Sequence, residues 1–360
     1  MKKILKITLM TIGFLVIFTV LWRFTQPLDK LNRISLYNHI FPGRERLPFG
    51  ESPQTAYNFS IGSLDAAFAS HKISGAGEKK AGTVRVITIG DSSSWGTLLR
   101  PEETLCGQLD GRGFSDGRII ECYNLAYPTL SLTKDYLLLN RAMNYDPDLI
   151  LWPLTMESFP TDKQADNALI QANLKEYLTL FSDDGKITIL PPETLFTQRR
   201  ETADWLRLQL YGVMWAGTGI DQDYPEDYPA PQLDLEADNT FHGFEGPLPD
   251  EAFSWNILEK GMIRAADVPV LLINEPMLIS NGQNSKIRYN YYYPREAYDS
   301  WHNRLLTDAE QNGWHLLDLW DSLETEAFTN SAIHYNAESA AQIAERVLAE
   351  IELILSNGQS

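Results

Sequence analysis

Apolar residues along the chain follow two alternating patterns. Near-continuous apolar runs of six or seven residues are separated by stretches with the three-to-four-residue period of amphipathic helices. The strand-like runs are 84–89, 119–125, 149–154, 268–274 and 314–319. The helical stretches are 102–109, 131–144, 255–266, 294–311 and 337–355. Because apolar strands that alternate with helices are buried on both faces, the pattern predicts an α/β protein with three layers and a mostly parallel, five-stranded sheet.

A different apolar run opens the chain. Three lysines lie among the first six residues, and the run from Ile4 to Trp22 counts about 19 residues, close to the roughly 20 that span a bilayer. No pair of small residues that would mark a cleavage site follows it, and the next residue is Arg23. We therefore expect residues 1–24 to form an uncleaved signal anchor in the cytoplasmic membrane, with the lysines inside and the rest of the chain outside the cytoplasm.

Composition divides the remainder into a lead-in and one large domain. Residues 25–82 are mixed in character and contain several prolines and glycines, which is typical of a stalk. The domain predicted over 83–357 is interrupted by an insertion at 158–254, which we expect to be partly helical over 166–180 and 201–215. Its acidic, proline-rich part includes Asp221, Asp223, Glu226 and Asp227, whose spacing does not match a calcium-binding EF-hand loop.

The net charge and the cysteines limit the partners and cofactors that we expect. The formal net charge of −18 disfavours nucleic acid, and it disfavours anionic lipid for the bulk of the chain. The two cysteines, Cys106 and Cys122, are expected either to form a disulfide outside the cytoplasm or to be two buried free thiols. Neither the cysteines nor the six histidines have the spacing of a metal site, and no phosphate-binding glycine loop is present, so we predict no metal and no cofactor.

The strongest chemical signal follows the first strand, in the stretch VRVITIGDSSSWG from Val84 to Gly96. Ligands of open parallel sheets bind beyond the carboxyl ends of the strands, and Gly90-Asp91-Ser92 lies at such an end. A serine becomes a nucleophile when a base, usually histidine, takes its proton. The motif therefore predicts an activated serine at the edge of the sheet.

These residues resemble the SGNH/GDSL hydrolase family. The segment ITIGDSSSWG is similar to the family's first block, which implies that Ser92 is the nucleophile. The segment NSAIHYNAESAAQIAERV, whose histidine lies just before the last helix, is similar to the block that carries the base, which implies that His334 is that base. In ECYNLAYPTLS, Asn124 matches the second block and Thr129 stands where the family commonly has glycine. The resemblance covers about 83–355 and implies the flavodoxin-like SGNH hydrolase fold.

The chain departs from the family pattern at two places. The acid usually lies three residues before the histidine, where this chain has Ser331, with Asn330 one step earlier. Three alternatives remain for His334: a neutral group such as Asn330 or Ser331 orients it, a carboxylate such as Asp318, Asp321 or Glu326 does so, or no group orients it.

The second departure is in the third block, LWPLTMESF. It offers Thr155, Met156 and Glu157 in place of the usual Gly-x-Asn-Asp, so the oxyanion donor from a side chain is missing. The backbone N–H groups of Ser92 and Thr129 remain as candidates, because main-chain donors do not depend on the side chain. Asn124 and Thr155 complete the set of oxyanion or orienting candidates.

Candidates for substrate binding come from two strand ends. Asp91 follows the first strand, and Asn274 and Glu275 follow the fourth, so all three are expected to face the crevice. Glu275 has two interpretations, one as a partner of a substrate hydroxyl and one as an ion-pair partner of Arg288 or Arg295. The aromatic segment YNYYYPREAYDSW is expected either to stack on sugar rings or to pack within a lid.

Three classes of function fit these observations. The first is a serine esterase that acts on ester-linked acyl groups, with a cell-surface carbohydrate as the expected substrate. The second is an accessory protein for polysaccharide O-acylation that moves an acyl group onto a sugar hydroxyl, with a membrane-bound acyltransferase as partner. The third is a non-catalytic binding or assembly module, suggested by the missing acid and the missing asparagine.

Overall fold

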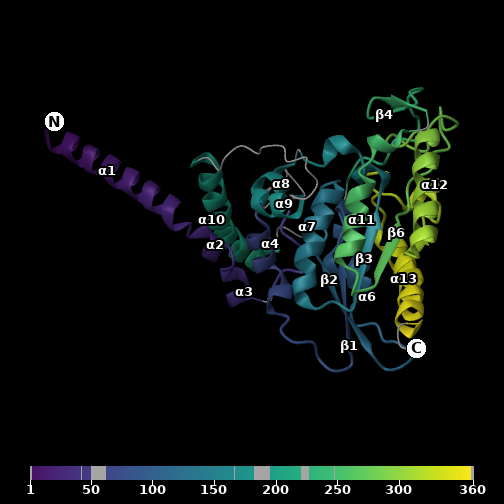
Figure 1. The fold of residues 1–360 in the computed structure, drawn as a ribbon, viewed down its shortest axis with the longest axis horizontal. Coiled ribbons are helices and arrows are strands. Elements are labelled where there is room, and N and C mark those ends of the chain that lie inside the picture. Colours follow the sequence, from purple (N-terminus) through teal and green to yellow (C-terminus); the bar gives the residue numbers. More distant parts are fainter. Residues whose placement is uncertain are drawn as a thin grey trace.

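A five-stranded parallel sheet forms the centre of the molecule (Figure 1). The computed structural model describes residues 2–41, 43–49, 62–165, 167–181, 195–219, 227–246 and 248–357. Each predicted strand is present: β1 Thr83–Thr88, β2 Ile119–Asn124, β3 Leu149–Leu154, β6 Val270–Asn274 and β7 His315–Asp318. Their order is β2-β1-β3-β6-β7, and all neighbours pair in parallel. This is the flavodoxin-like order of a doubly wound sheet, and it confirms the predicted fold class.

Helices cover both faces of the sheet. They are α5 Ser92–Trp95, α6 Leu105–Leu109, α7 Leu132–Ala142, α11 Trp255–Arg264, α12 Arg295–Asn312 and α13 Ala337–Asn357. Side chains that alternate along β1 enter two separate cores: Val84 and Val86 pack with α6 and α13, whereas Ile87 packs with α7, α11 and α12. The alternation follows from the two-residue period of a strand, and the three predicted layers are confirmed.

The disulfide alternative is the one that the structure contains. Cys106 of α6 and Cys122 of β2 are bonded, with 5.6 Å between their Cα atoms. The bond joins a covering helix to the edge strand.

Removing this bond is expected to lower the free energy of unfolding by about 3 kcal/mol, because it closes a loop of roughly 15 residues in the unfolded chain. The measurement is urea unfolding of the Cys106→Ser, Cys122→Ser variant beside the oxidised and the reduced wild-type chain. The reduced wild-type chain should lose the same stability, and identical midpoints for all three proteins would contradict the prediction.

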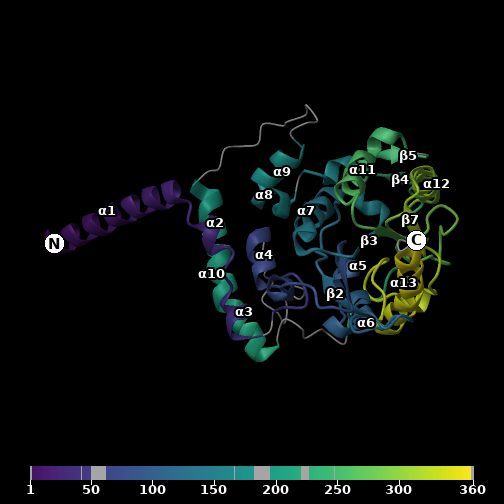
Figure 2. The ribbon, with the colours of Figure 1, turned by 60° about the horizontal axis from the view of Figure 1, so that its bottom comes forward.

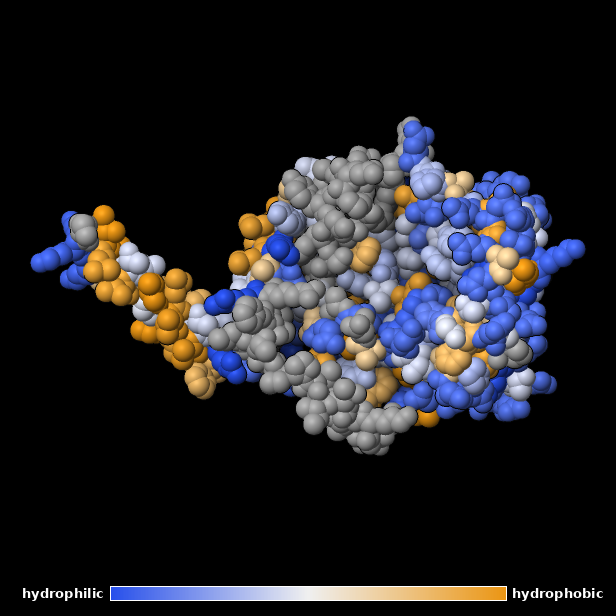
Figure 3. All heavy atoms as spheres, turned by 90° about the horizontal axis from the view of Figure 1, so that it is seen from above, coloured by the Kyte–Doolittle hydropathy of each residue, from blue (hydrophilic) through white to orange (hydrophobic). Residues whose placement is uncertain are grey.

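The first helix extends away from the folded body. Helix α1 Lys2–Thr25 has no buried residue, and it is long and apolar enough to cross a membrane, a property that signal sequences share. Figures 1 and 2 show it projecting from one end of the molecule. Figure 3 shows that its surface is largely apolar.

The lead-in at 25–82 is more than a stalk, which corrects our expectation. It contains α2 Leu28–Leu31, α3 Leu36–Ile40 and α4 Leu64–Ser70, and Leu47, Leu64 and Phe68 are buried in the main core. Helix α4 has only seven residues, which is too few for a helical period to be recognised in the sequence. Its buried alanines allow it to pack closely against the core. The described part of this segment therefore belongs to the folded body.

The insertion is partly helical, as expected. It contains α8 Ala168–Ala172, α9 Leu174–Phe181, α10 Leu195–Thr218 and a short hairpin of β4 Thr240–Phe241 and β5 Phe244–Glu245. Asp166, Asp221, Asp223 and Glu226, which the sequence analysis considered, lie outside the described residues. Figure 2 shows α10 beside α2 and α3, so the insertion and the lead-in lie together.

Candidate active site

Ser92 and His334, 242 positions apart, meet at the carboxyl-terminal rim of the sheet. His334 Nε2 lies 2.8 Å from Ser92 Oγ, and His334 Nδ1 lies 2.8 Å from Asn330 Oδ1. Since Asn330 Oδ1 only accepts, Nδ1 carries the proton and Nε2 is left as the acceptor for the serine hydroxyl. A hydroxyl, an imidazole and an amide oxygen are thus joined in a row by hydrogen bonds, an arrangement like that of a catalytic triad.

A tight turn after β1 presents Ser92. Gly90 has φ of +134°, and a Cβ there would lie 2.7 Å from Ser94 Oγ, so a side chain cannot be accommodated. Asp91 caps α5 by accepting a hydrogen bond from the backbone N–H of Ser93 at 2.9 Å. These two residues fix Ser92 at the first position of the helix, half-exposed and facing His334.

The lead-in braces this turn from behind. One guanidinium nitrogen of Arg46 donates to the carbonyl oxygens of Gly96 at 2.8 Å and Leu99 at 3.0 Å, and its guanidinium lies over the Trp95 ring at 4.1 Å. Trp95 in turn donates its indole N–H to Leu47 O at 2.9 Å. Arg46 was not among the predicted site residues, because nothing in the local sequence pattern brings residue 46 to residue 96.

Burial controls the charge on the histidine. It lowers the pKa of His334 to about 4, because the imidazolium would lose its hydration. Asn330 is neutral, so it orients the ring without offsetting this loss. His334 is therefore an uncharged base over the whole neutral range.

Of the proposed orienting groups, Asn330 is the one in place. Ser331 Oγ instead accepts a hydrogen bond from the Tyr291 hydroxyl at 3.4 Å. Asp318 accepts from His302 and from Asn274, each at 2.8 Å, and so belongs to a different contact set. Within the described residues, the contact to Nδ1 comes from Asn330 and from none of the proposed carboxylates.

Several expected oxyanion donors are engaged elsewhere, which corrects the sequence-based hypothesis. The N–H of Thr129 donates to Tyr127 O at 2.6 Å. Asn124 is buried, and its amide donates to Ser94 O at 2.9 Å. The hydroxyl of Thr155 donates to Asp91 Oδ2 at 3.1 Å. The backbone N–H of Ser92, at the start of α5, is the remaining candidate donor of that set.

The expected substrate-binding residues lie beneath the site and not in it. Asn274 is buried between Asp318 and the hydroxyl of Tyr298. Glu275 is also buried and accepts a hydrogen bond from Ser94 Oγ at 3.1 Å, so neither the substrate-hydroxyl nor the arginine interpretation holds. Asp91 is buried as the helix cap.

These carboxyl groups form a buried layer under the nucleophile turn. Burial raises the pKa of Asp91, and it raises that of Glu275 well above its ordinary value. Burial also raises the pKa of Asp135 to about 6, although its ion pair with the fully buried Lys134 acts in the opposite direction. Lys134 also donates to Gly90 O, which ties this charged layer to the turn that carries Ser92.

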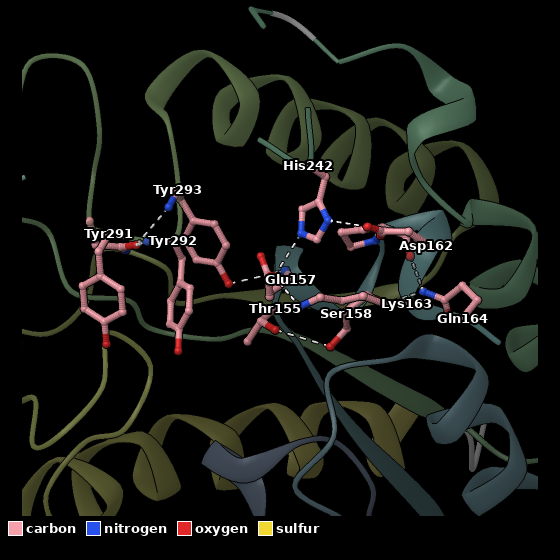
Figure 4. A network of polar contacts seen from close by, with 12 residues as sticks. Thr155, Glu157, Ser158, Asp162, Lys163, Gln164, His242, Tyr291, Tyr292 and Tyr293 are labelled. Atoms are coloured by element: carbon pink, nitrogen blue, oxygen red, sulfur yellow. Dashed lines mark hydrogen bonds and ion pairs between the residues drawn. The ribbon is translucent and has the colours of Figure 1, made fainter. Parts of the chain in front are cut away.

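A second polar network borders the site (Figure 4). His242, from the loop between β4 and β5, lies between Asp162 and Glu157, at 2.8 Å and 3.0 Å. Lys163 also contacts Glu157, and the hydrogen bond that the Glu157 carboxylate accepts from His242 raises the pKa of His242. Glu157 follows β3, and no sequence signal linked it to His242 in the insertion.

Two tyrosines connect this network to the histidine turn. The hydroxyl of Tyr293 accepts from the N–H of Glu157, at 3.4 Å, whereas that of Tyr291 accepts from the N–H of Ala332, at 2.7 Å. Figure 4 shows the rings of Tyr291 and Tyr292 pointing the same way, away from Glu157. Tyr291 thus lies beside the turn that carries His334, and Tyr293 lies beside the charged network.

Comparisons with known proteins find likeness in structure but not in sequence. The sequence matches no protein-family model and no curated protein. The structure is similar to a member of the lipolytic protein G-D-S-L family from Veillonella parvula, at 9% identity and a TM-score of 0.37, over 74% of this chain and 97% of that chain. It is also similar to a carbohydrate acetylesterase family member from Sinorhizobium meliloti, at 11% identity and a TM-score of 0.35, over 76% and 97%.

A third similar structure is the aryl esterase of M. smegmatis, at 12% identity and a TM-score of 0.32, over 74% of this chain and 99% of that chain. Because these TM-scores lie below 0.5, we take the fold and the chemistry of the site from this chain's own geometry.

Proposed function

We propose that this chain is a serine ester hydrolase of the SGNH type that removes acyl groups from a carbohydrate at the cell surface. The observation that carries the proposal is the 2.8 Å contact between Ser92 Oγ and His334 Nε2, with Asn330 on the other ring nitrogen. A serine within hydrogen-bond distance of a neutral, oriented imidazole is an activated nucleophile.

The reaction has two steps. Ser92 Oγ attacks the carbonyl carbon of the ester while His334 Nε2 takes the hydroxyl proton, and the N–H of Ser92 is placed to stabilise the oxyanion. His334 then gives the proton to the departing alcohol, which leaves an acyl-serine. Water, deprotonated by His334, attacks the acyl-serine and releases the carboxylic acid.

The aromatic side of the site supports a carbohydrate. Tyr291 and Tyr292 are only half-buried, and their rings are of the kind that stack on sugars. The disulfide and the exposed apolar helix α1 support a location outside the cytoplasm, with α1 as the membrane anchor.

The same side of the site also favours a second candidate function. A hydroxyl of a sugar that stacks on the tyrosines can take the place of water, so that the acyl group moves to the sugar. In that case the chain is an O-acyltransferase accessory protein, and a membrane-bound acyltransferase is the expected supplier of the acyl group.

A fluorophosphonate probe tests the catalytic proposal. It should label the wild-type chain and a Ser115→Ala control, in which an exposed serine is changed, but not Ser92→Ala. Acetate release from p-nitrophenyl acetate should be lost in the same variant. Acyl transfer to an added oligosaccharide, at the expense of acetate release, would favour the second function. If Ser92 is neither labelled nor required, the chain is a binding module and the catalytic proposal is wrong.

A further inference from the structure

One end of the folded body carries an apolar surface beside α1. We define it as the apolar platform: Ile34, Leu36 and Ile40 from the α2–α3 region, with Leu206 and Leu210 from α10. Each of these five side chains is between 46% and 68% exposed. Figures 1 and 2 show α2, α3 and α10 together at the end of the body nearest α1, running across the direction of α1. Figure 3 shows apolar side chains at that end.

The platform is held rigidly from within. The side chain of Gln209 accepts from the N–H of Leu36 and donates to Ile34 O, both at 2.8 Å. A Cβ at Gly212 would lie 3.2 Å from Tyr37 Cβ, so α10 and α3 are in close contact there. Because the polar and small residues face inward, Leu206 and Leu210 are left on the outer face, one turn apart.

This concentration of exposed apolar side chains is unusual for a water-facing surface. Outside α1, eleven large hydrophobic side chains of the described residues are exposed, and five of them belong to the platform. Single exposed apolar residues need no explanation, but a contiguous group marks a contact surface.

The connection to α1 restricts what can cover the platform. Only Gln26 and Pro27 separate the end of α1 from the start of α2. Two residues span at most about 7 Å, which is roughly the thickness of one headgroup layer. If α1 crosses a bilayer, α2 begins among the lipid headgroups, and the platform lies at the same level.

The local charge also suits a lipid surface. Residues 23–40 and 195–218 contain six lysines and arginines but three acidic residues, in a chain with a net charge of −18. Arg23, Lys30, Arg33, Arg199 and Arg207 are all exposed. Basic residues around an apolar helix face are typical of helices that lie in a membrane interface. The chain as a whole is acidic, whereas these two segments carry more basic than acidic residues.

We propose that the apolar platform lies in the headgroup layer of the bilayer that α1 crosses. The proposal rests on α1 being the membrane anchor, and it gives α10 of the insertion a role in fixing the orientation of the body. The lipid contact places the folded body against the membrane at a set angle, so that the Ser92 site is held at a constant height above it.

Site-specific labels in the full chain test this contact. The Leu210→Cys variant is labelled with pyrene and placed in vesicles that contain nitroxide-labelled lipids. The label attaches only to the new cysteine, because both native cysteines are in the disulfide. Leu353→Cys is the matched control, because Leu353 is also exposed but lies on α13, far from α1 (Figure 1). We expect the lipid nitroxide to quench the label at 210 severalfold more than the label at 353, and aqueous iodide to show the opposite order. Leu36→Cys should behave like Leu210→Cys.

The outcomes separate this proposal from the anchor on which it rests. Vesicle flotation reports the anchor, and a chain that does not float overturns both. A chain that floats with equal quenching at 210 and 353 keeps the anchor but overturns the platform contact. Pyrene excimer emission at 210 without lipid quenching would show that a second copy of the chain covers the platform, which also overturns the proposal.

Discussion

Replacing His334 by glutamine is expected to lower kcat/KM for p-nitrophenyl acetate by about 10²–10⁴-fold, the usual contribution of a general base. His334 Nε2 is the acceptor for the Ser92 hydroxyl, and no other side chain is recorded at that oxygen within the described residues. Glutamine keeps a polar group of similar reach but has no basic nitrogen. The fluorophosphonate reaction at Ser92 should slow by a similar factor, because it needs the same activated hydroxyl.

The matched control is His315→Gln, which changes an exposed histidine on β7. Its rate should stay within about twofold of the wild-type rate, since substitutions of exposed residues away from a site have small effects. Equal rates for His334→Gln and wild type would show that the contact between residues 92 and 334 has no part in turnover.

The sheet was predictable because its strands are buried on both faces. The run 149–154 is apolar throughout and 84–89 is mostly apolar, which is the composition that a central parallel strand needs. Once the strands are parallel, their carboxyl ends share one rim, which is why a motif at residue 92 predicts the position of a site. The link to residue 334 came from the family resemblance and not from periodicity.

The environment of each strand-end residue was not predictable. Glu275 and Asn274 follow β6 as expected, but whether they point into the crevice or below it depends on the turn at Ser94 and on Tyr298. Those contacts join residues 24 to 181 positions apart, and no local pattern reports them. The same holds for His242, which reaches Glu157 from a loop of the insertion.

The third member of the site shows the limit most clearly. The sequence offered two neutral residues and three carboxylates as partners for His334, and the choice depends on the shape of one turn. The N–H of Thr329 donates to His334 O at 2.8 Å, which closes the turn and brings Asn330 back toward the ring. Asn330 then contacts Nδ1, whereas Ser331 points toward Tyr291. Residue type alone would have favoured a carboxylate.

This neutral partner leads to a clear expectation for pH dependence. Burial lowers the pKa of His334 to about 4, so the wild-type kcat/KM should fall only as the pH drops through about 4, and not near the ordinary value of 6.5. The folded state binds this proton less readily than the unfolded chain does. The histidine therefore contributes stability above pH 6.5 that is lost as the pH falls toward 4.

Asn330→Asp should move that acid limb upward and raise the rate above it. An aspartate of the same shape would accept a charge-assisted hydrogen bond from the Nδ1–H group. This bond stabilises the imidazolium and raises the pKa of His334. Such a bond is about twice as strong as a neutral one, so we expect kcat at pH 8 to rise about tenfold. Asn330 is only half-buried, so water can hydrate the new carboxylate.

Asn330→Ala is the paired variant, and it should lower kcat without moving the acid limb upward. The two pH profiles of kcat/KM decide the matter: if Asp and Ala at 330 give the same profile, the residue only fills space, and His334 takes its orientation from the backbone turn alone.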